Sequence, residues 1–128
     1  MVTKNNNIKI GLIVAVVIIV AFLFFYLTIL FQQNIEKKHP RIAYNGSVFG
    51  KVKKVWVNIG VVNFNLYNLK QFSTVDSRNY DYSPEFIDEF IINGDSIYKP
   101  KNSDTLYVFR DNNKYFFILG KFINKKNK

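Results

Sequence analysis

Cysteine is absent from the 128-residue sequence, which excludes disulfide bonds, thiolate catalysis, cysteine-ligated metals and a lipidated N-terminal cysteine. The absence leaves the compartment open, because both sides of a membrane contain proteins without cysteine. Histidine occurs only at position 39, so a histidine-rich metal site is excluded as well. We place His39 in a solvated linker, because a histidine base must lie inside a pocket to act in catalysis.

The sequence also lacks the glycine-rich phosphate loop, the Walker pattern and the Gly-x-Ser-x-Gly motif. Paired carboxylates could perform acid–base chemistry on a glycan, and five acids cluster along residues 76–89. They lack the spacing of a calcium loop, and we interpret them as a polar loop and an exposed helix face. The five are Asp76, Asp81, Glu85, Asp88 and Glu89. We therefore predict a protein that is not an enzyme and has no cofactor or metal, with a carboxylate-based hydrolase as the alternative.

The net charge of +9 is concentrated at the two ends of the sequence. Residues 1–41 carry +4, residues 42–120 carry +1, and residues 121–128 carry +4. A nucleic-acid groove needs a basic stripe on the folded surface, so this distribution disfavours nucleic acid as a partner. Lysine and arginine beside a membrane helix are attracted to anionic lipid headgroups, so the lipid bilayer is the first partner that the sequence predicts.

Residues 10–31 form an uncharged apolar run, in which 17 of the 22 residues are Ile, Leu, Val or Phe. A helix of this length spans about 33 Å, and the hydrocarbon core of a bilayer is about 30 Å thick. A cleaved signal peptide has a shorter apolar region followed by a small-x-small site, and this run has neither feature. We therefore predict one transmembrane helix over residues 10–31 and a single-pass membrane protein.

The count of cations beside this run leaves its orientation open, because two lysines precede it and three cations lie within residues 37–41 after it. The polar head before the run favours one orientation. Residues 1–9 form a polar head with two lysines, typical of a signal anchor that leaves the head inside and exports the C-terminal part of the chain. Residues 32–43 are a polar juxtamembrane linker, which leaves as extended chain at His39-Pro40. A small domain, 44–122, and a basic tail, 123–128, come after the linker, and we expect both on the extracytoplasmic side of the cell membrane.

Alternation of apolar and polar residues predicts short strands through the domain. They are expected at 48–59, 62–66, 69–75, 96–99, 105–110 and 115–119. The alternation changes phase within the first of these, which predicts a β-bulge at Lys53-Lys54, and Gly60 then permits a turn. The polar stretch 111–114 predicts a hairpin between the last two strands.

A short helix is predicted before the fourth strand. Ser83 would cap its N-terminus, Pro84 would occupy its first position, and Asn93-Gly94 would end it. Five or six short strands with such a helix favour a small OB-like barrel, and a rolled sheet with the helix packed on it is the alternative. The predicted fold class is therefore mainly β plus one N-terminal transmembrane helix. The 17 aromatic residues among 42–128 supply apolar area for a domain without disulfides.

The stretch GDSIYKPKNSDTLYVFR, residues 94–110, and the KYFF that comes after it at 114–117 resemble a group of small uncharacterised bacterial envelope proteins. Members of this group pair a signal or anchor segment with a short β-rich domain, and many look like lipoproteins. The resemblance extends from residue 50 to about residue 121 but is specific only in the C-terminal stretch. This chain departs from the group in its longer apolar run and its lack of cysteine. The resemblance implies an exported location and no particular activity.

Aromatic side chains near cations in the predicted strands are the candidate binding residues. Interleaved aromatics and cations can stack bases or sugars, as on OB surfaces, and an apolar face covered by the helix is the competing interpretation. The candidates are Trp56, Tyr98, Lys99, Lys101, Tyr107, Phe109 and Arg110. Asp95 lies just after the predicted helix end, where we expect it to accept backbone N–H bonds.

These features lead to two functional hypotheses. The first is a membrane-tethered, non-enzymatic interaction module that binds an envelope protein or polymer through its β surface. Tethering raises the effective concentration of a weak site near the membrane. The alternative is an OB-like binder of single-stranded nucleic acid or another anionic polymer, whose affinity would fall steeply with salt. The near-neutral charge of residues 42–120 favours the first hypothesis.

Overall fold

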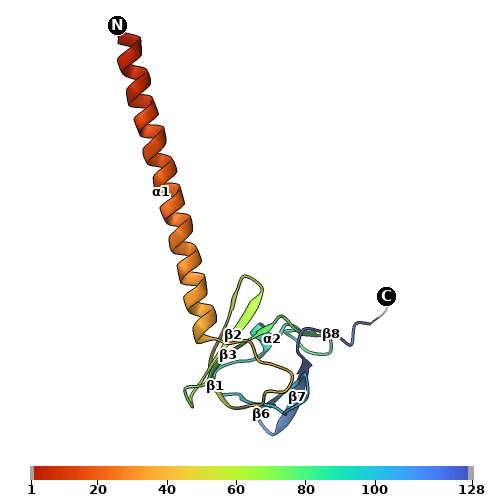
Figure 1. Ribbon diagram of the computed structural model, residues 1–128. Coiled ribbons are helices and arrows are strands. Elements are labelled where there is room, and N and C mark those ends of the chain that lie inside the picture. The colour runs from red at the N-terminus through yellow and green to blue at the C-terminus, as the bar shows by residue number, and fades with distance from the viewer. Residues whose placement is uncertain (1, 127–128) are drawn as a thin grey trace. The chain divides into compact units, whose positions relative to one another are not determined.

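The computed structural model describes residues 2–126 and divides into two compact units, with the boundary after Lys37. The first unit contains all but the last residue of helix α1, Val2–Lys38, which is long and apolar enough to cross a membrane (Figure 1). The helix extends beyond the predicted span 10–31 at both ends. The predicted linker is therefore helical up to Lys38, because the first residue that disfavours helix before it is Pro40.

The second unit is built on one open sheet of six antiparallel strands, in the order β3-β2-β1-β5-β6-β7. The strands are β1 (Val48–Asn58), β2 (Val61–Leu66), β3 (Gln71–Val75), β5 (Ser96–Lys99), β6 (Thr105–Arg110) and β7 (Asn113–Ile118). Two short strands that were not predicted, β4 (Arg78–Asn79) and β8 (Phe122–Ile123), pair in parallel with each other. The two ends of the six-stranded sheet do not pair, so the expected OB-like barrel is not closed.

Strand β1 is shared by the two halves of the sheet. Its residues 48–51 pair with β5, and its residues 52–58 pair with β2. The register shifts between Val52 and Lys54, which confirms the predicted bulge. A bulge bends a strand and increases its twist, so β1 can pair with two partner strands in succession. Gly60, with a φ of 72°, then turns the chain into β2 as predicted.

The predicted hairpin after β6 is confirmed, with a tighter turn than expected. Arg110 pairs with Asn113, so the loop has only two residues, Asp111 and Asn112. Their φ values of 49° and 64° are those of a type I′ turn, which Asp and Asn tolerate. This turn places Lys114 within β7 and fixes which side chains of β7 lie opposite those of β6.

One face of the sheet carries the hydrophobic core, which includes the short helix α2, Ile87–Phe90. Its aromatic rings pack closely, with Phe90 stacked on Tyr82 at 4.9 Å and edge-on to Phe117 at 5.4 Å between centroids. Each fully buried side chain of this kind contributes roughly 1.5–3 kcal/mol. The buried apolar residues are Val48, Val52, Val62, Phe64, Leu66, Phe72, Ile87, Phe90, Ile91, Ile97, Leu106, Val108 and Phe117.

Helix α2 begins later in the sequence than predicted. Ser83 and Pro84 lie in an irregular loop, the N-cap is Phe86, and no side chain caps the helix. The chain stays extended through Phe86 because the Ile87 N–H donates to the Ser77 carbonyl at 3.0 Å, as one strand does to another. The predicted helix start is therefore wrong, since pairing with a distant segment outweighs the local preference of Ser-Pro for a helix start.

The helix also ends earlier than predicted. Its last residue is Phe90, and Ile91 forms the C-cap with an extended backbone. Asn93-Gly94 therefore lies outside the helix, in the turn that leads into β5. Gly94 has a φ of 95°, and its N–H donates to the Val52 carbonyl at 2.8 Å, which ties this turn to β1.

Other parts of the chain occupy both edges of the sheet. On β3, Ser73 exchanges two backbone hydrogen bonds with residues 40–42, of 2.9 and 3.0 Å. On β7, the Phe116 N–H donates to the Tyr82 hydroxyl, and the Phe116 carbonyl accepts from the Asn79 side chain, both at 3.1 Å. In a closed barrel the edge strands β3 and β7 would pair with each other through their backbone N–H and C=O groups. Some of these groups are already bonded to the segments just named.

Candidate binding surface

The outer face of β1, β5, β6 and β7, which points away from the core, carries a row of aromatic side chains. Four residues lie directly opposite one another on these adjacent strands, and we call them the aromatic row: Phe49, Tyr98, Tyr107 and Phe116. Their neighbours along each strand, such as Ile97, are buried, because successive side chains point to opposite faces. Strands in a sheet lie about 4.8 Å apart, so the row is about 14 Å long.

Three rings of the aromatic row are exposed, Tyr107 is half-buried, and the two tyrosine rings are held by contacts. The exposed fractions are 70% for Phe49, 41% for Tyr98 and 38% for Phe116. The Tyr98 and Tyr107 rings are stacked, with centroids 6.5 Å apart and planes at 17°. The Lys114 Nζ lies 4.1 Å from the centroid of the Tyr107 ring, a cation–π contact worth about 0.5–1 kcal/mol at an exposed site.

A second row runs beside the aromatic row, two residues further along each strand. We call it the lysine row, and its members are Lys51, Ser96, Phe109 and Lys114. Phe109 is 41% exposed and adds a fifth accessible ring to the outer face. The two rows contain two lysines and no acid, and β1 carries two more exposed lysines, Lys53 and Lys54, at its bulge beyond the rows.

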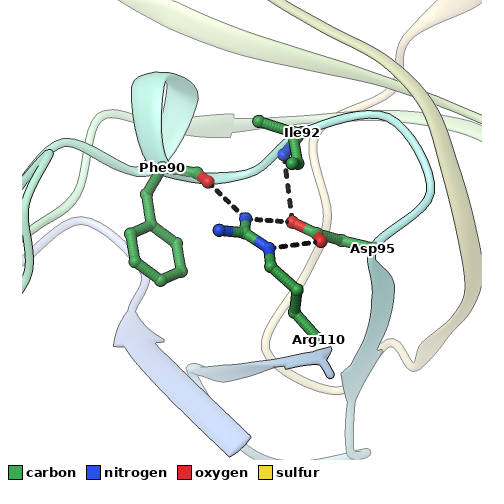
Figure 2. Close-up of polar contacts among 4 residues, drawn as sticks. All are labelled: Phe90, Ile92, Asp95 and Arg110. Carbon is green, nitrogen blue, oxygen red and sulfur yellow. Dashed lines mark hydrogen bonds and ion pairs between the residues drawn. The ribbon is translucent and has the colours of Figure 1, made fainter. Parts of the chain in front are cut away.

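A hollow of about 460 Å³ lies beside the lysine row, lined by Lys51, Phe109, Asp111 and the loop 92–95. Figure 2 shows the ion pair in its wall. The Arg110 Nε and Nη2 donate to the two carboxylate oxygens of Asp95, at 2.7 and 2.5 Å. Two parallel bonds of this kind fix the planes of both groups.

The remaining hydrogen bonds of this pair go to the backbone. The Ile92 N–H donates to Asp95 Oδ2 at 3.0 Å, which confirms the expected backbone contact of Asp95. The Arg110 Nη2 also donates to the Phe90 carbonyl at 2.6 Å (Figure 2). The hydrogen bond to Asp95 raises the pKa of Arg110, so the guanidinium is charged throughout the physiological range. The pair ties the end of α2 and the adjoining loop to β6, and Arg110 acts in the fold.

Lys99, another candidate for binding, is buried, and its exposed fraction is only 1%. Its Nζ donates to the carbonyl oxygens of Tyr44, Gly46 and Pro100, at 3.0, 2.5 and 3.2 Å. Burial lowers the pKa of Lys99, and the nearby Asp104 carboxylate opposes that shift. The ammonium joins residues 44–46 to the end of β5 and does not reach the outer face.

Trp56 lies apart from the aromatic row, on the half of the sheet where β1 pairs with β2. His39 packs against it edge to face, with ring centroids 4.8 Å apart, and lies 2.7 Å through Nε2 from Asn65 Oδ1. The Ser73 hydroxyl donates to the His39 carbonyl at 2.8 Å. These contacts bury His39, so the prediction that it lies in a solvated linker is wrong. The linker residues before it belong to α1, and His39 itself belongs to the β domain.

Of the predicted binding residues, the structure brings Tyr98, Tyr107 and Phe109 together on the outer face. Lys101 is exposed in the turn after β5 and belongs to neither row. The prediction missed five members of the rows, and they are Phe49, Lys51, Ser96, Lys114 and Phe116. Alternation indicates the face of each of these residues, but the pairing register that aligns them is not visible in the sequence.

Two of the five acids in the cluster of residues 76–89 have local structural contacts. Asp76 accepts the Ser77 N–H at 2.8 Å, and Glu85 forms an ion pair with Arg78. Burial raises the pKa of Asp76, and the Asp88 carboxylate adds to this shift. Within residues 2–126, no group of three or more histidines and acids is placed to hold a metal ion.

A comparison with known proteins finds no matching family model, no matching curated protein and no matching solved structure.

Proposed function

We propose that the chain is a single-pass membrane protein whose β domain is a non-enzymatic binding module on the extracytoplasmic side. The observation that carries this proposal is the aromatic row, four rings in register on four adjacent strands. Exposed aromatic patches on small domains commonly mark interaction sites. Rigid rings also give a large contact area at a low cost in conformational entropy.

The membrane location in the proposal is supported by α1. The apolar residues of α1 are exposed in the chain as it stands, and a bilayer would cover them. His39, the residue that follows the helix, is already buried in the β domain. The connection between the helix and the domain is therefore short, and the module would be held close to the headgroups. Tethering at that distance gives a weak binding surface a high effective concentration for a partner at the membrane.

Photo-crosslinking in intact cells tests the binding surface. We expect a photoreactive phenylalanine analogue at Phe49 or Phe116 to give specific crosslinked products, because both side chains belong to the aromatic row. Tyr44 is the matched control, since it is an exposed aromatic residue outside both rows. Products of equal yield from all three positions, or no product from the two row positions, would contradict the proposal.

Protease treatment of intact cells tests the orientation. With a tag placed after Lys128 and the outer layer permeabilised, we expect external protease to remove the tag while the membrane stays sealed. The reason is that a signal anchor leaves its polar head inside and exports the domain. A tag that is cleaved only after the membrane is lysed would show that the domain faces the cytoplasm. A cytoplasmic marker protein in the same sample reports whether the membrane remained sealed.

A further inference from the structure

Five of the eight acids of residues 42–120 lie in one segment, 76–89. This segment leads into and overlaps α2, whose Ile87 and Phe90 are buried in the core. On the outer face, Lys51 and Lys114 are the charged side chains of the two rows. The acids next to the rows are Asp95, whose charge is paired with Arg110, and Asp111, at the tip of the hairpin. The outer face therefore complements an anionic partner and not a second copy of itself.

The shape of the aromatic row indicates a linear partner. The row crosses the strands at right angles and is about 14 Å long, so an extended chain can contact all four rings in succession. The tyrosines at its centre also carry hydroxyl groups, which both donate and accept hydrogen bonds. A line of aromatic rings, two of which carry hydroxyl groups, suits a polysaccharide, because each of its units is a sugar ring with hydroxyl groups.

The density of cations distinguishes between anionic polymers. A nucleic acid carries one charge per nucleotide, and its binding sites contain a basic stripe that neutralises many phosphates. Lys51 and Lys114 are the only cations of the two rows, and the Lys114 ammonium already lies over Tyr107. The exposed Lys53 comes two residues after Lys51 in β1, beyond the rows. Two cations beside five rings fit a polymer with sparse charge, in which contact with the rings contributes most of the affinity.

We infer that the aromatic row binds a linear anionic polysaccharide, with its sugar rings against the aromatic side chains and its carboxylates near Lys51 and Lys114. This inference rests on the proposed function and names the class of its ligand. Lys51 and Lys114 occupy opposite ends of the lysine row. Each lysine would therefore bind a different carboxylate, and the two carboxylates would be separated by uncharged sugars. An exterior glycan would thereby be held beside the membrane through many weak contacts, whose effects multiply along the polymer.

The experiment measures binding of the full-length chain in neutral detergent micelles to labelled polysaccharides. The anionic probes are hyaluronan and unsulfated chondroitin, which carry one carboxylate per disaccharide. The neutral probe is dextran, and oligothymidylate represents single-stranded nucleic acid. We expect both anionic polysaccharides, or at least one of them, to bind at least tenfold more tightly than dextran and oligothymidylate. Tighter binding of oligothymidylate, equal binding of dextran, or no binding of either anionic probe would overturn the inference.

Variants in the rows separate this site from general attraction between charges. We expect Tyr107→Thr to weaken binding about tenfold or more, because it removes a central ring and the contact of Lys114 with that ring. Lys114→Gln should weaken binding severalfold and reduce its dependence on salt, whereas Lys101→Gln, which changes a lysine outside both rows, should leave binding unchanged. Equal losses in Lys114→Gln and Lys101→Gln would contradict a site at the rows.

Two further readouts keep the result interpretable. Trp56 is the sole tryptophan and lies off the rows, so its fluorescence reports whether each variant is folded. If Tyr107→Thr proves unfolded, Phe49→Thr removes a ring that is 70% exposed at the end of the row. Crosslinks at Phe49 without polysaccharide binding would refute this inference and leave the binding module intact, whereas the absence of both would refute both.

Discussion

Replacing Asp95 by Ala is expected to lower the free energy of unfolding by about 3 kcal/mol, the lower end of the usual cost of breaking a buried ion pair, because the Arg110 side chain is 27% exposed. Asp95 is 3% exposed, and its carboxylate receives both the Arg110 guanidinium and the Ile92 N–H. The substitution leaves the guanidinium next to Phe90 without its anion. We expect the loop 92–95 to detach from β6 as a consequence, which would also deform the hollow beside the lysine row.

Urea unfolding monitored by Trp56 fluorescence measures this loss, because the single tryptophan lies in the domain and not in α1. Asp95→Asn should have a smaller effect, since an amide oxygen can still accept the Ile92 N–H. Glu89→Ala is the control, because Glu89 is an exposed acid in α2 whose removal should change stability by less than about 0.5 kcal/mol. If Asp95→Ala and Glu89→Ala had the same unfolding midpoint, the structural role of the pair would be refuted.

Replacing Lys99 by Met has the second largest expected effect, a loss of about 2–3 kcal/mol in the free energy of unfolding. Methionine preserves most of the apolar stem but leaves the carbonyls that the ammonium binds without a donor. Lys101→Met is the matched control, because Lys101 is exposed in the adjacent turn and should tolerate the change. A loss of equal size in both variants would show that the buried ammonium has no special role.

The pH dependence of this difference has a definite sign. Burial lowers the pKa of Lys99 in the folded state below its ordinary value of 10.5. The unfolded chain then binds more protons than the folded chain in the window just below pH 10.5, so the wild-type protein gains stability as the pH rises through it. Lys99→Met lacks this titration, so the difference in free energy of unfolding between wild type and Lys99→Met should grow as the pH rises through this window. A deficit that shrinks over the same window would indicate a raised pKa instead.

Local patterns predict the strands well where tertiary contacts agree with them. Ser96–Lys99 and Thr105–Arg110 have the predicted bounds, and the bulge after Val52 agrees with the change of phase in β1. The helix start at Ser83 fails for a nonlocal reason, since residues 85–87 pair with 77–79, which cannot be read from the Ser-Pro signal. The polar linker is helical for a related reason, because polarity alone does not end a helix.

The binding surface, too, is predictable from local sequence patterns only in part. Tyr98, Tyr107 and Phe109 are identifiable as exposed aromatics from alternation, and they do lie on one face. Lys99 is a neighbour of Tyr98, and two consecutive strand residues point to opposite faces, so alternation already predicts that it cannot join them. Phe49 and Phe116 come from strands that are distant in sequence, and only the pairing register aligns them with the tyrosines.

The occupied edges of the sheet matter most when many copies share one membrane. An exposed strand edge can recruit the same strand of a neighbouring molecule, and confinement to two dimensions would favour such growth. Here residues 40–42 cover part of β3, and Tyr82 with Asn79 bonds to the middle of β7. Crowded copies would therefore remain discrete rather than merge into a continuous fibril, and each would keep its own outer face available to solvent.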